Sequence, residues 1–134
     1  MPHGHRWRSA QGSEPCPRRI YRFVEPCLLL LLHQSETHGY DLLERLKQFG
    51  FKENPIDSSV VYRTLRDMEG EGLVVSVWDT SATTGPLRRV YRLTAEGHRA
   101  LAWWVADLRE TDQVLHRFLA AYEEHMREEE GEHH

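Results

Sequence analysis

The chain has 134 residues and a formal net charge of -4, with 40% hydrophobic and 28% charged residues. This size and composition are typical of one globular domain with an ordinary core. The longest apolar run, residues 27–32, is far shorter than the roughly 20 residues that a membrane-spanning helix needs. No long apolar segment follows the basic N-terminus, as it would in a secretory signal. We therefore expect a cytoplasmic protein.

Charge is distributed unevenly along the chain. Residues 1–93 contain 13 basic and 11 acidic side chains, a net charge of +2, whereas residues 94–134 contain 4 and 10, a net charge of -6. A surface that faces phosphate depends on local charge rather than on the total. The acidic total therefore does not exclude nucleic-acid binding by the first part of the chain.

The N-terminal third predicts a flexible arm followed by a buried helix. Residues 1–17 are rich in Pro, Gly, Ser, His and Arg and contain too little apolar surface to offset the entropy of ordering. Folded structure is expected from residue 18. Residues 19–34 are apolar around most of a helical circumference, which is typical of a helix buried on more than one side. Pro26 indicates a kink or a new helix start.

Two amphipathic helices are expected next. Residues 40–49 have apolar side chains at the 3.6-residue period, and Gly50 is the expected stop. In residues 57–69, Asp57 is a suitable N-cap residue and the apolar stripe turns one face to the core. The opposite face of this third helix is polar and basic.

The period then changes from 3.6 to 2, which predicts a β-hairpin. Residues 73–78 alternate as a strand does, residues 79–86 have a loop composition, and residues 87–93 form a second β-prone run. Thr94 is the expected cap of a long last helix, and Glu96 suits its first turn, where the helix dipole favours negative charge.

The last helix has a heptad seam over about three and a half heptads. A helix of roughly 35 residues extends about 50 Å, so it needs a partner for this stripe. We expect the same helix of a second subunit, together with the first helix, to cover it. The seam consists of Leu101, Trp104, Leu108, Thr111, Leu115, Phe118, Tyr122 and His125.

This order of elements predicts a mainly α fold with a β-hairpin. Three helices and a hairpin over residues 18–93 are typical of a winged helix-turn-helix domain, and residues 94–134 would form a C-terminal dimerisation helix with an acidic tail. The major groove of DNA, about 12 Å wide, accommodates one α-helix. A dimer of this kind reads two half-sites about one helical turn apart on a pseudo-palindrome.

Four motifs carry a resemblance to a known family. They are His-Gly-Tyr-Asp-Leu-Leu at 38–43, Ser-Val-Val-Tyr-Arg-Thr-Leu at 59–65, Glu-Gly-Leu at 71–73 and Arg-Arg-Val-Tyr-Arg-Leu-Thr-Ala-Glu-Gly at 88–97. In this order they resemble the PadR family of bacterial transcriptional regulators, and the single C-terminal helix is similar to its smaller subclass. The resemblance implies a homodimeric repressor, often autoregulatory, that a small effector releases from DNA.

The resemblance also assigns a DNA-binding face. It places contacts on the third helix and on a basic pair at the wing, the tip of the hairpin. Arg side chains on such a face can pair with guanine or with a phosphate oxygen, and the sequence does not decide between them. An isolated Arg pair on a helix is also commonly only a solvated surface. The candidate residues are Ser58, Ser59, Tyr62, Arg63, Arg66, Arg88 and Arg89.

Aromatic residues outside this face have two interpretations. Trp103 and Trp104 either pack in the dimer core or form a wall of an effector cavity on which a flat apolar ligand stacks. Phe23 and Val24 would complete that wall. By contrast, Tyr40 and Tyr91 are expected in the core.

Other functions find little support in the sequence. Cys16 and Cys27 do not form a C-x2-C pair, so no zinc site is expected. A Gly-rich phosphate loop and a G-x-S-x-G motif are both lacking, so we expect neither an enzyme nor a cofactor. The alternative is a winged-helix module that binds a protein and not DNA. Ion pairs from the candidate arginines to Asp67 and Glu69 would favour it.

Overall fold

The computed structural model describes residues 21–50, 56–81, 85 and 87–132. The predicted arm at residues 1–17 and Cys16 lie outside the described residues. The chain divides into two compact units, one ending at Leu101 and one beginning at Ala102. We describe each unit by itself.

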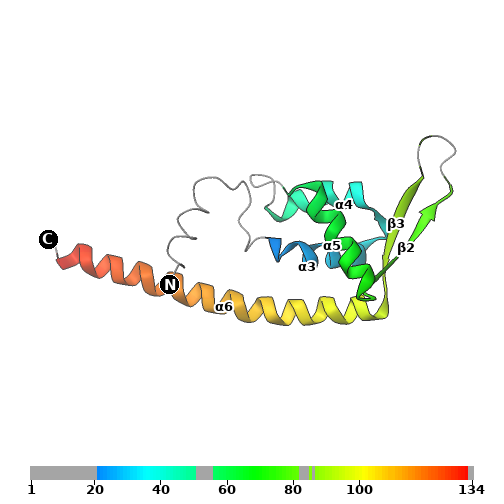
Figure 1. Cartoon of the computed structure of the whole chain (residues 1–134). Helices are drawn as coiled ribbons and strands as arrows, with labels where there is room; N and C mark the ends of the chain where they lie inside the picture. Colours follow the sequence, from blue (N-terminus) through cyan, green and yellow to red (C-terminus); the bar gives the residue numbers. More distant parts are fainter. Residues whose placement is uncertain (1–20, 51–55, 82–84, 86, 133–134) are drawn as a thin grey trace, which may run out of the picture. The chain divides into compact units, whose positions relative to one another are not determined.

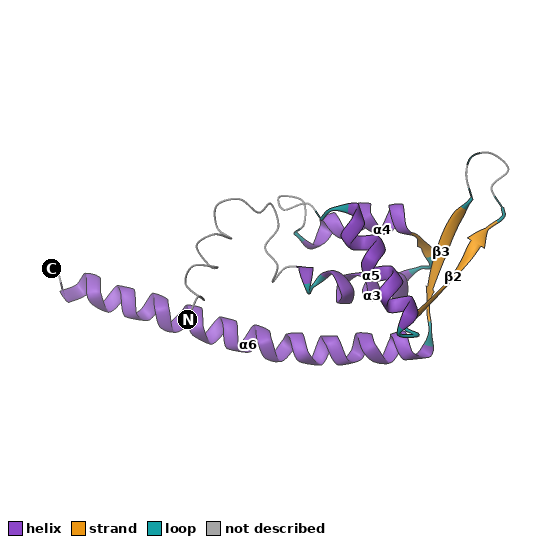
Figure 2. Cartoon of the chain, viewed as in Figure 1, coloured by secondary structure: helices purple, strands orange, loops and turns teal. Residues whose placement is uncertain are grey.

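The first unit combines short helices with a small antiparallel sheet (Figures 1 and 2). The helical elements are α3 (Val24–Gln34), α4 (Gly39–Arg45), the 3-10 helix η1 (Leu46–Phe49) and α5 (Ser58–Gly70). The strands are β1 (Thr37–His38), β2 (Val74–Asp79) and β3 (Arg88–Leu93), in the spatial order β1-β3-β2. The hairpin β2–β3 extends away from the three α-helices (Figure 1). This arrangement confirms the predicted mainly α fold with a hairpin.

Helix boundaries follow local chemistry. Pro26 lies in the first turn of α3, where the N–H that proline lacks would have no intrahelical acceptor. The expectation of a new helix start near Pro26 is therefore confirmed. Gly50 ends η1 with φ of 96°, a left-handed conformation that glycine adopts without a steric penalty. Asp57 caps α5 by accepting a hydrogen bond from the Ser59 amide at 3.3 Å.

One hydrophobic core joins α3, α4, α5 and the sheet. The apolar stripe of α5 is fully buried, as predicted from its spacing. Side chains of α3 are buried on several of its faces, which explains its almost uniformly apolar sequence. The fully buried side chains are Val24, Leu28, Leu29, Leu31, Leu42, Leu46, Val61, Leu65, Met68 and Val74.

The sheet contains a strand that the sequence did not indicate. The two-residue strand β1 pairs with β3 in the register Thr37↔Tyr91. Tyr91 is only 7% exposed, which confirms its predicted core position. The prediction for Tyr40 is wrong, because this side chain is 62% exposed. The turns of α4 direct Leu42 into the core and leave Tyr40 on the other side.

The start of α6 (Ala95–Glu132) is tightly packed against the turn before β2. Thr94 caps the helix, as predicted: its Oγ1 accepts from the Gly97 amide at 3.1 Å and donates to the Gly72 carbonyl at 2.6 Å. A Cβ at Gly97 would overlap the carbonyl oxygen of Leu73. Glycine is therefore required for this close approach between helix and backbone.

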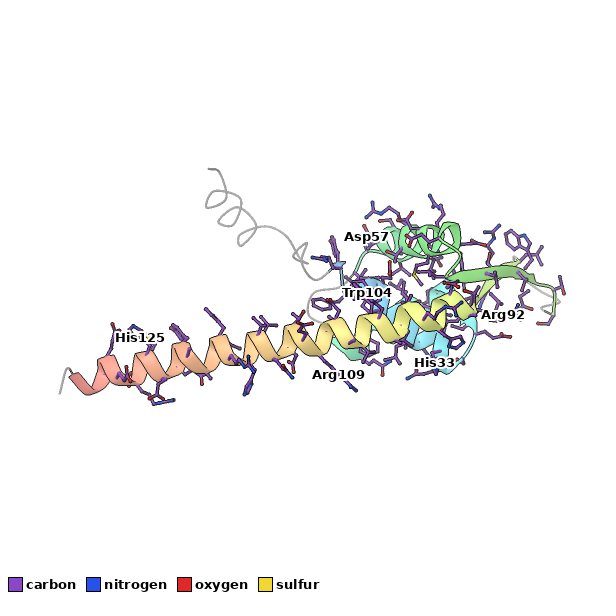
Figure 3. All side chains as sticks on the ribbon, turned by 90° about the horizontal axis from the view of Figure 1, so that it is seen from below. His33, Asp57, Arg92, Trp104, Arg109 and His125 are labelled. Carbon is purple, nitrogen blue, oxygen red and sulfur yellow. The ribbon has the colours of Figure 1, made fainter. Side chains whose placement is uncertain are left out.

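The second unit is the remainder of α6. Its apolar side chains at Leu115, Phe118 and Tyr122 are each more than half exposed in the single chain. His125 lies farther along the same exposed helix (Figure 3). The predicted seam is thus uncovered along these residues. Within the described part of the chain, no helix has the length and apolar character needed to cross a membrane.

Candidate nucleic-acid interface

The outer face of α5 is polar, basic and exposed. Ser59, Tyr62, Arg63 and Arg66 lie on the side opposite the buried stripe, and Ser58 is exposed in the first turn. Among the residues that the structure describes, neither Arg63 nor Arg66 forms an ion pair. Both guanidinium groups are therefore available to a ligand.

Tyr62 is held by its neighbour on α4. Its ring packs so closely against Gly39 that a Cβ at Gly39 would overlap the ring atom Cε1. The side chain nevertheless remains 41% exposed. Its ring therefore packs against α4 while part of the side chain is available at the surface of α5.

The two arginines of the wing differ. Arg89 forms an ion pair with Glu69 near the end of α5, with an Nη1–Oε1 distance of 3.7 Å, and lies 5.1 Å from the ring centroid of Trp78. Ser76 also donates to Glu69, at 2.7 Å. Arg88 forms no ion pair with any carboxylate in the described residues. Arg89 therefore fastens the hairpin to α5, whereas Arg88 is the more available cation.

A hollow lies between α5, the start of α4 and the base of the wing. It has a volume of about 490 Å³. Only three of its eight lining residues, Tyr62, Arg88 and Arg89, were predicted site residues. His38 was missed because the sequence does not indicate that β1 pairs with β3. The hollow is lined by His38, Gly39, Tyr40, Tyr62, Leu87, Arg88, Arg89 and Tyr91.

Two titratable groups near the wing have perturbed pKa values. The pKa of Asp79 is lowered mainly by hydrogen bonds from the Ser81 hydroxyl and amide, with smaller contributions from the nearby His38 and Arg88. Burial raises the pKa of the Tyr91 hydroxyl. Asp79 therefore stays ionised and engaged in its own turn, and Tyr91 stays neutral.

The predicted effector residues fall into both units. Trp103 and Trp104 pack edge to face with their ring centroids 5.3 Å apart, and Trp103 is 61% exposed. Phe23 is the residue before α3 and is 36% exposed, whereas Val24 is fully buried. The tryptophan pair thus offers exposed aromatic surface, and Val24 offers none in the single chain.

The described residues do not form a candidate metal site. They contain no group of three or more His, Cys, Asp or Glu side chains placed to hold a metal ion. Burial raises the pKa of the Cys27 thiol to about 11. Cys27 is therefore a protonated, weakly nucleophilic side chain at neutral pH.

Solved structures similar to this chain include bacterial transcriptional regulators. A PadR-like transcriptional regulator from Bacillus cereus matches with a TM-score of 0.61 at 25% identity, over 71% of this chain and 89% of that one. Bacillus subtilis PadR in complex with operator DNA matches with a TM-score of 0.55 at 25% identity, over 63% of this chain and 47% of that one. A PadR family regulator from Clostridium difficile shares the fold, with a TM-score of 0.63 at 22% identity, over 72% of this chain and 98% of that one.

The family model gives the assignment. No curated protein matches the chain significantly. The model of the transcriptional regulator PadR-like family matches residues 28–103, more than half of the chain, from α3 into α6. This match confirms the resemblance carried by the four motifs, and it agrees with a regulator rather than an enzyme. The chain belongs to the PadR-like family of transcriptional regulators.

Proposed function

We propose that this protein is a homodimeric repressor that binds a pseudo-palindromic DNA operator and is released from it by a small-molecule effector. The observation that carries the DNA-binding part is the exposed face of α5, where Arg63 and Arg66 have no ion-pair partner among the described residues. An arginine that contacts a DNA phosphate releases condensed counterions, and this release favours binding. The solved complex of Bacillus subtilis PadR with operator DNA supports the same role.

In this proposal the chain works in the segments expected from its sequence. Residues 18–93 bind DNA, and residues 94–134 form the dimerisation helix. The helix α5 enters the major groove with Ser58, Ser59, Tyr62, Arg63 and Arg66, and Arg88 and Arg89 lie over the backbone at the wing. A regulator of this kind acts in the cytoplasm, where bacterial DNA is located.

Dimerisation is supported by the uncovered apolar side chains of α6. Leu115, Phe118 and Tyr122 recur at heptad spacing and are exposed in the single chain. Burying such a stripe against a second copy contributes about 25 cal/mol for each Å² of apolar surface removed from water. A parallel or antiparallel pair of α6 helices would also set the distance between two recognition helices.

Effector binding is proposed at the tryptophan pair. A flat apolar ligand would stack on Trp103 and Trp104. The alternative role of the pair is packing in the dimer core. Tryptophan fluorescence that responds to a ligand, and a matching loss of DNA affinity, would support the effector role. A broad panel of planar ligands without any effect on fluorescence would contradict it.

Hydroxyl-radical footprinting on DNA upstream of the protein's own gene tests the repressor proposal. We expect two protected patches centred about 10 base pairs, or one helical turn, apart on a pseudo-palindrome. Loss of both patches in the Arg63→Ala/Arg66→Ala variant would assign them to α5. Protection of only one patch would contradict binding as a symmetric dimer.

A second candidate function is a winged-helix module that binds a protein partner. The Arg89–Glu69 ion pair favours it, because this arginine is already engaged within the chain. The DNA-binding proposal has more support, because the other three candidate arginines lack such pairs in the described residues. Failure to enrich any duplex from a random-sequence library, with folded dimeric protein, would favour the protein-binding module.

A further inference from the structure

The contacts of the His38 side chain determine which of its two ring nitrogens carries the hydrogen. His38 caps α4, and its Nδ1 accepts a hydrogen bond from the Asp41 amide at 3.3 Å. A neutral imidazole has one donor and one acceptor nitrogen. Because Nδ1 accepts, the ring hydrogen lies on Nε2. The ring therefore presents a donor on the side that faces the wing.

That donor faces a second donor. The guanidinium nitrogen Nη1 of Arg88 lies 3.3 Å from Nε2 of His38. An arginine side chain has no acceptor, so the two groups cannot hydrogen-bond each other while Nδ1 accepts from Asp41. Both side chains line the hollow beside α5. Two donors converge there without a shared acceptor.

The acidic side chain of Asp79 on the neighbouring strand β2 does not serve as that acceptor. Asp79 is opposite Arg88 in the β2–β3 register, and the nearby Arg88 and His38 make small contributions to its lowered pKa. Its Oδ1, however, accepts from the Ser81 amide at 2.9 Å and from the Ser81 hydroxyl. No ion pair joins Asp79 to Arg88 in the described residues. The pair of donors is therefore suited to an oxygen that arrives from outside the chain.

We propose that His38 is a further DNA-contacting residue, whose Nε2–H donates together with Arg88 to one phosphoryl oxygen of the DNA backbone. This inference rests on the proposed function, because the hollow borders the exposed face of α5. A charged acceptor suits both donors and makes stronger hydrogen bonds than a neutral one. A backbone phosphate held between α5 and the wing fixes the register of the protein on the duplex without reading its sequence.

The test distinguishes two roles of His38, capping of α4 and contact with the DNA backbone. In His38→Asn, the amide oxygen still caps α4 but is too short to reach the position of Nε2. We expect unchanged thermal stability and a DNA affinity about ten- to a hundredfold lower, the value of one hydrogen bond to a charged acceptor. The loss should be equal on the upstream duplex and on a random duplex. His116→Asn, on the exposed surface of α6, is the matched control and should bind as wild type.

Arg88→Gln and the double variant test the shared phosphate. The logarithm of the DNA affinity falls linearly with the logarithm of the salt concentration. Arg88→Gln should make this slope less steep by about 0.9, as expected for one lost phosphate contact. If both residues hold one oxygen, His38→Asn should cost less in the Arg88→Gln background than in wild type. Fully additive losses would contradict the shared site.

The remaining outcomes distinguish this inference from the proposed function. Wild-type affinity in His38→Asn, with DNA binding otherwise normal, would overturn the inference alone. Absence of DNA binding by wild type would overturn both. Inorganic phosphate, titrated while the His38 ring is followed by NMR, tests a free anion as the source of the oxygen. Saturation of the ring shift by phosphate, with no effect of His38→Asn on DNA binding, would assign the pair to a free anion and overturn the DNA contact.

Discussion

The candidate DNA-contacting side chains of α5 and β3 differ in the interactions they make within the chain. Arg63 and Arg66 have no ion-pair partner among the described residues, Arg89 is fastened to Glu69, and the Tyr62 ring packs against Gly39. An arginine without an ion pair in the protein gives up no such interaction when it binds DNA. A group already paired must exchange one interaction for another. Arg63 and Arg66 are therefore the residues from which we expect the largest contribution to specific binding.

Replacement of Arg63 by alanine tests this ranking. If Arg63 reads a base, Arg63→Ala should weaken operator binding by about 1–3 kcal/mol and leave binding to random duplex much less affected. Arg109→Ala removes the same charge from the exposed surface of α6 (Figure 3) and serves as the control. Fluorescence anisotropy with both duplexes measures the effect. An unchanged operator affinity would remove Arg63 from the interface.

Gly39 is expected to influence DNA binding without touching DNA. In Gly39→Ala the new Cβ would overlap the Tyr62 ring, and a side chain can move where a backbone cannot. The fold should therefore remain stable while Tyr62 shifts. The free energy of DNA binding should weaken by roughly 0.5–1.5 kcal/mol, which is the contribution of one hydrogen bond. In Gly70→Ala the Cβ meets open space at the end of α5, so this control should bind as wild type. Thermal melts and DNA titrations of both variants distinguish these results.

At the level of elements, the junction between the hairpin and α6 is closely packed. Thr94 and Gly97 bring the first turn of α6 against the backbone of residues 72–73. His98, one residue later, packs edge to face on His33 at the end of α3, with ring centroids 5.0 Å apart. The start of α6 is thereby fixed to the winged-helix core.

Gly97→Ala should therefore destabilise the protein. The added Cβ overlaps the Leu73 carbonyl oxygen and approaches the Leu93 side chain, and the backbone cannot retreat without disturbing the cap. Overpacking of this kind costs about 1–3 kcal/mol. Urea unfolding at a fixed protein concentration measures it. In Gly131→Ala, where a Cβ meets nothing within 4 Å, stability should not fall. Equal stability of both variants would contradict the close packing at Gly97.

Sequence periodicity predicted the longer elements and failed at contacts between distant residues. The change from a 3.6-residue to a two-residue period located α5 and the hairpin, because burial of one face imposes each period. Two residues cannot show a period, so β1 was missed, and with it the position of His38 beside Arg88. The Arg89–Glu69 pair joins residues that only the packing of β3 near α5 brings together. Tyr40 was wrongly placed in the core because aromatic character alone does not define the buried side of a helix.

For the whole molecule, the uncovered heptad seam of α6 predicts a dimer. Phe118→Glu places a charge on this seam and should lower the dimerisation affinity at least tenfold, because burial of an unpaired carboxylate is unfavourable. Ala120→Glu adds the same side chain outside the seam and is the control. Sedimentation equilibrium over a range of concentrations measures both. A wild-type protein that stays monomeric at high concentration would contradict the dimer, as would equal behaviour of the two variants.

The most direct test of the central claim is a titration of the purified protein with duplex DNA from upstream of its own gene. Binding is followed by fluorescence anisotropy from about 50 to 200 mM salt, with a random duplex as control. Our account predicts a complex of one dimer per duplex that prefers the upstream sequence and whose affinity falls steeply with salt. Equal, weak binding of both duplexes at every salt concentration would contradict sequence-specific DNA binding and favour the protein-binding module.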